Sequence, residues 1–234
     1  MNKLLETHYF KKKIRCGVNA DGGYVFAELN GDYDCYISAG ISNEESFTRD
    51  FLQKYKIATP HNYAFDGTIR SYPSQYCKTI QFIRKNISGE NTEATTNLDF
   101  LTDKYKDIFL KMDIEGGEYP WIKTANLNPF KQIVIEFHGI NDDGWGTNLE
   151  DKKKCLEKLN ETHYIVHAHG NNFGPVNGSM PNVLELTYIR KNYFTTKPEL
   201  NNELLPIPNL DFPNNPQYRD IPLNFNPFFF NFNL

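Results

Sequence analysis

The sequence predicts an α/β protein with a mostly parallel sheet, and two observations support this fold class. Short apolar runs alternate with helical patterns from Tyr33 to Arg190, as in consecutive β-α-β units. Seven runs are suited to strands, at 33–38, 61–66, 80–84, 108–113, 132–138, 163–168 and 183–190. With 234 residues, the chain is long enough for one domain with a substantial core.

The segments between these runs carry helix signals. Helices are expected over 43–55, 97–105, 118–124 and 148–160. The first begins at Asn43, has two acidic residues in its first turn, and places Phe47 and Phe51 at helical spacing. The short helix at 118–124 is expected to be interrupted near Pro120.

The composition divides the chain into three parts. We expect an N-terminal extension with a covering hairpin over 1–32, the main domain over 33–197, and a tail over 198–234. The turn Asp21-Gly22-Gly23 fits either a covering hairpin or a lid over a ligand. The tail is rich in Pro, Asn and Phe, so no regular element is expected there. Its aromatic end has enough apolar surface to wrap its own domain or to form a homodimer.

Charge and cysteine content exclude several classes of protein. The net charge of −4 argues against a nucleic-acid partner, which a clustered basic surface would favour. No run of apolar residues is long enough for a signal peptide or a membrane span. The four cysteines are far apart, as expected for free thiols in a reducing compartment. These features predict a soluble, cytoplasmic protein.

Three of the predicted strands end in pairs of ionisable residues followed by glycine. The pairs are Asp113 with Glu115, Glu136 with His138, and His167 with His169. Side chains alternate along a strand, so each pair is expected to share a face, and three neighbouring parallel strands would gather them at one rim. Simpler roles remain open: Glu115 and Glu118 could stabilise a helix start, and His167 could be a satisfied buried histidine.

The first two strands end in features of a nucleoside site. Gly40 follows the first strand, but there is no G-x-G-x-x-G, and two acids open the next helix, which disfavours a pyrophosphate. Asp66 ends the second strand, where an acid can bind ribose hydroxyls. Together they favour S-adenosylmethionine over NAD. The predicted cofactor-binding residues are Asp21, Gly40, Ser42, Asn43, Glu44, Asp66 and Gly67.

Several motifs together resemble the FkbM-like family of S-adenosylmethionine-dependent O-methyltransferases. The most specific, over 110–118, is Leu-Lys-Met-Asp-Ile-Glu-Gly-Gly-Glu. The others are Arg15-x-Gly17, Asp21-Gly-Gly-Tyr-Val, Gly40-Ile-Ser-Asn-Glu-Glu-Ser-Phe, Phe65-Asp66, Thr96-Asn-Leu-Asp-Phe-Leu and Val134-Ile-Glu-Phe-His. The resemblance covers about 14–190 and implies a class I methyltransferase fold, a Rossmann-like three-layer sandwich with an antiparallel last strand. It also implies a hydroxyl acceptor on a sugar or natural product. The less glycine-rich turn at Gly40 and the tail depart from the family pattern.

Methylation of a hydroxyl requires a base or a metal, because a neutral hydroxyl is a poor nucleophile. Asp113, Glu136 and His138 are the predicted ligands of Mg²⁺ or Mn²⁺. His169 is the preferred general base, and Asp113, Glu115 and His138 complete the predicted catalytic set. The acceptor is expected to be a small molecule or a glycan. A metal-dependent hydrolase and a non-catalytic nucleoside- or glycan-binding module remain as alternatives.

Overall fold

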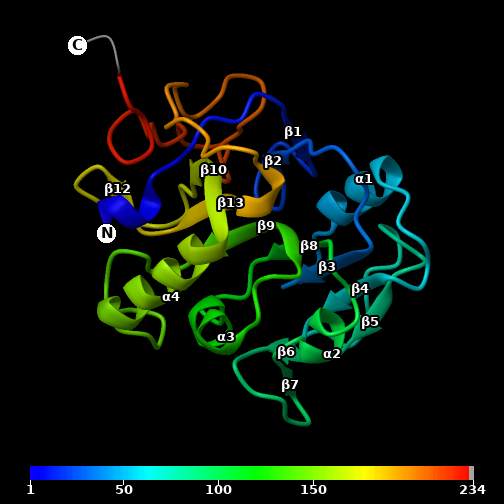
Figure 1. Ribbon diagram of the computed structural model, residues 1–234. Helices are drawn as coiled ribbons and strands as arrows, with labels where there is room; N and C mark the ends of the chain where they lie inside the picture. The colour runs from blue at the N-terminus through cyan, green and yellow to red at the C-terminus, as the bar shows by residue number, and fades with distance from the viewer. Residues whose placement is uncertain (232–234) are drawn as a thin grey trace.

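The computed structural model describes residues 1–231 and is built on one seven-stranded sheet (Figure 1). From edge to edge the strands are β10 (His163–Gly170), β13 (Leu184–Arg190), β9 (Phe130–Phe137), β8 (Ile108–Met112), β3 (Cys35–Ala39), β4 (Asn62–Phe65) and β5 (Gln81–Ile83). β13 runs antiparallel to both of its neighbours, and the other neighbouring strands are parallel. The predicted seven-stranded sheet with an antiparallel last strand is confirmed.

One detail of the predicted strand order is wrong. β8 and β9 are neighbours, but β13 separates β9 from β10. Because β13 is antiparallel to both, β9 and β10 still run in the same direction and end at the same edge of the sheet. The register places Glu185 of β13 opposite both Glu136 and His169. An additional acid therefore lies between two of the predicted ionisable pairs.

The two faces of the sheet are covered differently. One face packs against α2 (Asp99–Thr102), α3 (Glu118–Thr124) and α4 (Leu149–Thr162). The other is covered by α1 (Ser46–Lys54) and by the hairpin of β1 (Lys13–Cys16) and β2 (Tyr24–Ala27), as Figure 1 shows. α3 continues through Pro120, contrary to expectation. Pro120 is its third residue, where the backbone N–H needs no partner within the helix.

Aromatic packing fixes α1 and the hairpin against the sheet. The Phe51 ring lies 4.1 Å from that of Phe109 and 4.8 Å from that of Tyr36, measured between centroids. Phe26 of the hairpin packs on both Phe51 and Phe109. Aromatic side chains bury large apolar areas, so this cluster holds α1 and β2 against the sheet.

The tail folds back onto its own domain. Leu205, Leu223 and Phe228 are buried in the main core, and the Thr7 N–H donates to the Pro227 carbonyl at 3.0 Å. As expected, no helix or strand forms between residues 198 and 231. The homodimer stays a prediction, and Phe232 of the aromatic end lies outside the described residues.

Short elements complete the described chain. They are η1 (Asn2–Leu5), η2 (Lys191–Tyr193) and the strand pairs β6 (Asn86–Ile87) with β7 (Thr95–Thr96) and β11 (Val176–Asn177) with β12 (Met180–Pro181). Over residues 1–231, no helix has both the length and the hydrophobicity that a bilayer span requires.

Candidate functional site

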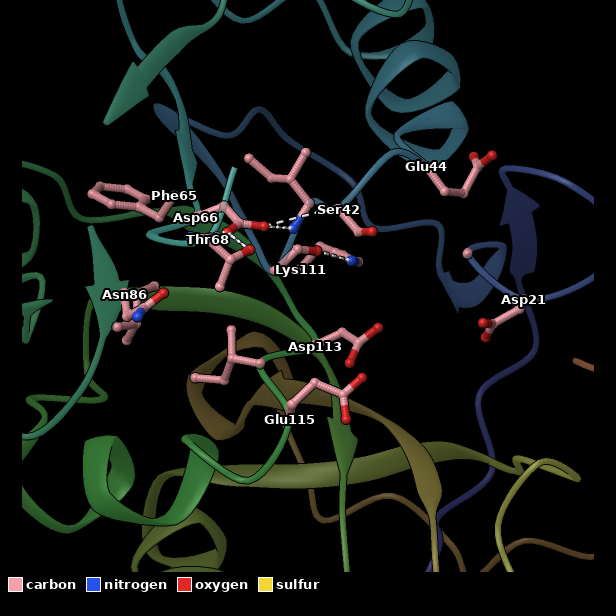
Figure 2. A pocket seen from close by; sticks show the side chains of 15 residues that line it. Asp21, Ser42, Glu44, Phe65, Asp66, Thr68, Asn86, Lys111, Asp113 and Glu115 are labelled. Atoms are coloured by element: carbon pink, nitrogen blue, oxygen red, sulfur yellow. Dashed lines mark hydrogen bonds between the residues drawn. The ribbon is translucent and has the colours of Figure 1, made fainter. Parts of the chain in front are cut away.

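A cavity of about 450 Å³ lies at the carboxyl ends of β3, β4 and β8 (Figure 2). Its lining residues are Asp21, Gly22, Gly40, Ile41, Ser42, Glu44, Phe65, Asp66, Thr68, Asn86, Ile87, Lys111, Asp113, Ile114 and Glu115. Five of the seven predicted cofactor-binding residues are among them. Asn43 and Gly67 are not.

The sequence reasoning missed several lining residues, and some could have been found. Asn86 and Ile87 come shortly after β5, so the rule that ligands bind beyond strand ends applies to them as well. The Gly67 N–H donates to Asn86 Oδ1 at 2.9 Å. Gly67 therefore positions a lining side chain although it does not line the cavity itself.

Asp66 organises the turn after β3. Its Oδ2 accepts the N–H groups of Ile41 and Ser42 at 3.1 and 3.0 Å, and its Oδ1 accepts the Thr68 hydroxyl at 2.6 Å (Figure 2). Burial acts to raise the pKa of Asp66, but these donors hold it below its ordinary value. Both carboxylate oxygens thus already have partners within the chain, and a ribose contact stays a prediction.

Gly40 is required by close packing between strands. Its φ is +75°, and a Cβ atom there would lie 1.4 Å from the Asp113 carbonyl oxygen. Only glycine allows the end of β8 to lie this close to the end of β3. The absence of a side chain at Gly40 therefore makes room for the backbone of Asp113, and not only for a ligand.

The lining of the cavity is acidic. Its carboxylates are Asp21, Glu44, Asp66, Asp113 and Glu115. Lys111 is the basic residue among the lining side chains; it is buried, its Nζ donates to the Gly40 carbonyl at 2.9 Å, and it lies 5.3 Å from the centre of the Tyr24 ring. Lys111 is thus held against the backbone, and the cavity favours a cationic ligand.

Asp113, Glu136 and His138 lie together as predicted. One ligand atom from each lies within 4.8 Å of the others. Asp113 Oδ2 accepts the Tyr24 hydroxyl at 3.1 Å, and Glu136 Oε1 accepts an N–H from Asn171 at 3.0 Å. The second oxygens, Asp113 Oδ1 and Glu136 Oε2, are buried without a hydrogen-bond partner in the described chain. This cluster therefore has two unused acceptors beside the cavity.

Several carboxylates surround Glu136 and outweigh the nearby charge of Lys111. Burial, followed by repulsion from Asp113, Glu185 and Asp21, raises the pKa of Glu136 well above its ordinary value. The tail supplies Asn214, whose amide donates to Asp21 Oδ1 at 3.1 Å and to Glu185 Oε1 at 2.6 Å. The sequence reasoning missed both Glu185 and Asn214.

His138 is oriented by a buried carboxylate. Its Nδ1 lies 3.2 Å from Glu118 Oε1, and its Nε2 lies 3.3 Å from Glu115 and 3.4 Å from Glu136. Burial lowers the pKa of His138, but Glu118, Asp113 and Glu115 outweigh it and raise the pKa overall. Glu118 therefore positions the ring, in addition to lying in the first turn of α3. Glu115 lies in the turn after β8, with φ +54°, and lines the cavity (Figure 2).

His169 does not have the environment of a general base. Its Nδ1 lies 3.0 Å from Glu185 Oε2, and its Nε2 lies 2.9 Å from Asp220 Oδ1 in the tail. Burial lowers the pKa of His169, but the two carboxylates raise it to about 10. The ring is protonated at neutral pH and has no free nitrogen, which argues against the predicted role. His167 is similarly engaged, with Nε2 2.9 Å from Asp211 Oδ1.

Comparison with known proteins assigns the family. Residues 6–173 match the model of the family described as the Methyltransferase FkbM domain. The chain belongs to the FkbM methyltransferase family. This assignment supports methyl transfer over the hydrolysis that the acids and histidines alone left open.

Two other comparisons add little detail. A search of curated proteins gave no match. A precorrin-6y C5,15-methyltransferase structure from Geobacter metallireducens GS-15 is similar at 11% identity with a TM-score of 0.34, over 69% of this chain and 82% of that one.

Proposed function

We propose that this methyltransferase moves the methyl group of S-adenosylmethionine to a hydroxyl of a saccharide. The observation that carries the proposal is that Asp113 belongs to two adjoining sites. It lines the acidic cavity, and it also forms the cluster with Glu136 and His138. A donor in the cavity and a hydroxyl at the cluster would therefore meet at the end of β8.

The cavity suits the donor by size and charge. Its volume of about 450 Å³ is within the range of small-molecule sites. S-adenosylmethionine supplies an electrophilic methyl group on a positively charged sulfur, and the lining carboxylates attract such a cation. A dinucleotide fits less well, because the N–H groups of Ile41 and Ser42 already bind Asp66 and are not free for a pyrophosphate.

The cluster suits the acceptor. In the reaction, a carbon–oxygen bond forms, the carbon–sulfur bond breaks, and the hydroxyl proton must leave. Asp113 Oδ1 can accept a hydrogen bond from an acceptor hydroxyl, and Glu136 Oε2 can accept one when ionised or donate one when protonated, since neither oxygen has another partner in the described chain. Fixed orientation of this kind lowers the barrier by removing rotational freedom before the reaction.

The same residues fit a divalent cation. Two carboxylates and one imidazole form a mainly oxygen donor set suited to Mg²⁺ or Mn²⁺. Burial and then neighbouring acids raise the pKa of Glu136, and a bound cation would offset the repulsion from those acids. Asp113, Glu136 and His138 would hold the ion, and the chemistry it supplies is a lower pKa of the acceptor hydroxyl.

The proton can leave by two routes, and the cation distinguishes them. With His138 engaged as a ligand, Glu115 at the cavity wall is the remaining acceptor, and burial raises the pKa of Glu115 and makes it a better base. Without a cation, His138 can accept the proton at Nε2 once that nitrogen has given its own proton to Glu115, 3.3 Å away, because the pKa of His138 is raised; Glu118 fixes the ring at Nδ1. Activity that survives chelation would select the second route.

The proposal is tested with Asp113→Asn. We expect wild-type protein, incubated with S-adenosylmethionine and a glycan panel, to add one methyl mass to a panel member. Asp113→Asn should lose turnover, yet bind S-adenosylhomocysteine within about threefold of wild type, because Asn keeps the shape of the cavity wall and this product has no sulfonium charge for a carboxylate to attract. Mass spectrometry and calorimetry give the two readouts. Failure of wild type to bind S-adenosylhomocysteine, or full turnover by Asp113→Asn, would refute the proposal.

A further inference from the structure

Trp145 is an exposed aromatic residue held directly beside the acid cluster. Its ring centroid lies 4.7 Å from that of His138, yet 47% of the residue is exposed. Gly116 and Gly139 make room for it: a Cβ atom at Gly116 would lie 3.0 Å from Trp145 Cβ, and one at Gly139 would lie 2.5 Å from Trp145 Cδ1. The absence of side chains at these two glycines, which follow β8 and β9, thus leaves space for Trp145.

Hydrogen bonds from one lysine tie together the loop that carries Trp145. Lys152 of α4 is buried, and its Nζ donates to the carbonyls of Gly139, Asp142 and Gly144 at 2.6, 3.1 and 2.7 Å. Trp145 itself has a φ of +60°, a region that side-chain-bearing residues seldom occupy. Such a conformation persists only where its surroundings impose it, and it is enriched at ligand sites. Here the imposed conformation presents an apolar ring to solvent.

We propose that Trp145 is the stacking platform for an uncharged sugar ring whose hydroxyls face Asp113 and Glu136; this rests on the proposed function. A pyranose has an apolar face of C–H bonds and a rim of hydroxyl donors. The indole face fits the first, and the unpartnered oxygens Asp113 Oδ1 and Glu136 Oε2 fit the second. His138 thus adjoins both the exposed indole ring and the cluster with the two unpartnered oxygens, and the proposed sugar would use one surface for each.

Charge selects the kind of sugar. Glu115 and Glu118 lie against the same His138 ring that Trp145 contacts, and Glu136 is the third carboxylate there. A uronic acid or a sugar phosphate would bring another negative charge to this group. Neutral sugars are therefore the favoured acceptors, and acidic ones are disfavoured.

The test uses Trp145 as its own probe. The sequence has two tryptophans, and Trp121 is fully buried, so the emission lost in Trp145→Phe identifies the exposed ring. Neutral methyl hexosides and disaccharides are compared with hexuronic acids and hexose phosphates in separate titrations, with S-adenosylhomocysteine present and divalent cations removed by a chelator. We expect neutral sugars to change this emission, and saturation-transfer NMR to show contact along one C–H face. Acidic sugars should bind at least about tenfold more weakly, or about 1.4 kcal/mol.

Variants then measure the platform directly. Trp145→Ala should weaken binding of the neutral sugars about tenfold, whereas Trp145→Phe, which keeps an aromatic face, should stay within about threefold of wild type. Leu204→Ala removes an exposed apolar side chain of the tail and should bind as wild type does. Thermal unfolding checks that each variant is folded. Unchanged binding by Trp145→Ala, a response to acidic sugars alone, or no response to any neutral sugar would overturn the platform.

The two proposals fail in different ways. If sugar binding depends on Trp145 but the protein does not bind S-adenosylhomocysteine, the platform proposal is supported and the proposed function is refuted. If Trp145→Ala binds the cofactor and methylates a sugar as wild type does, the proposed function is supported and the platform proposal is refuted.

Discussion

Replacing His169 with Gln tests whether this residue is a structural cation that fastens the tail to the sheet. The ring joins Glu185 of β13 to Asp220 of the tail through two contacts of 3.0 and 2.9 Å. His169 is 2% exposed, so water does not screen these contacts. Gln has a similar reach but no charge, and the variant would leave the two carboxylates without a cation between them.

The size of the effect follows from the pKa of His169. Burial lowers this pKa, but Glu185 and Asp220 raise it from 6.5 to about 10. At about 1.36 kcal/mol per pKa unit, such a rise corresponds to about 5 kcal/mol of preference for the protonated ring. Removing one partner of a buried ion pair typically costs about 3–5 kcal/mol, so we expect His169→Gln to lower the free energy of unfolding by that amount.

The pH dependence gives a second measure with a definite sign. Because the folded pKa is raised, the stabilisation is fully present below the unfolded pKa of 6.5 and is lost as the pH rises through about 10. Urea unfolding from pH 6 to pH 10 should therefore show a fall in wild-type stability that His169→Gln lacks. The double variant His169→Gln/Asp220→Asn removes one repelling carboxylate and should recover part of the loss.

The opposite outcome is equally definite. If His169→Gln unfolds at the wild-type urea concentration but methylates about 10²–10⁴ times more slowly, the residue is a general base after all.

Three further predictions concern the cofactor turn and the cluster. Asp66→Ala should weaken S-adenosylhomocysteine binding by about 1–3 kcal/mol, because the N–H groups of Ile41 and Ser42 lose their acceptor; unchanged affinity in calorimetry would contradict this. Glu118→Gln should slow methyl transfer about 10–100-fold with cofactor affinity unchanged, because the His138 ring loses its charged partner; wild-type rates would assign Glu118 to the helix start alone. Chelator-treated protein should lose methyl transfer activity and recover it when Mg²⁺ or Mn²⁺ is added. Full activity after chelation would show that the reaction needs no metal.

The strands were predictable because most of them are buried on both faces and read as apolar runs. The boundaries were less so, and β9 shows why. It begins at Phe130 rather than 132, although Lys131 and Gln132 are polar. Lys131 Nζ reaches the carbonyls of Asn30 and Asp32, and Gln132 exchanges hydrogen bonds with the Ala27 backbone. Their partners come from segments about 100 residues away in the chain, which a local pattern does not reveal.

Part of the site was predictable from the direction of the strands. Asp113 directly follows β8, and Glu136 and His138 lie at the end of its parallel neighbour β9, so the rule that carboxyl ends meet at one edge predicted that they lie together. This rule does not predict the position of Glu185, because β13 is antiparallel and the start of this strand lies at the same edge. Nor does it predict that of Asn214, because the tail has no periodic pattern and its partner Asp21 is 193 residues away.

His138 and His169 show where sequence reasoning reaches its limit. Both follow an apolar run, both come two residues after another ionisable group, and both precede a glycine. Their environments nevertheless differ. His138 faces Glu115 at the wall of the open cavity, whereas Asp220 of the tail covers His169. Neither strand encodes that difference, since it depends on where a distant tail places one carboxylate. A motif can therefore indicate a candidate catalytic histidine, but the partners of its second ring nitrogen determine whether the ring can exchange a proton.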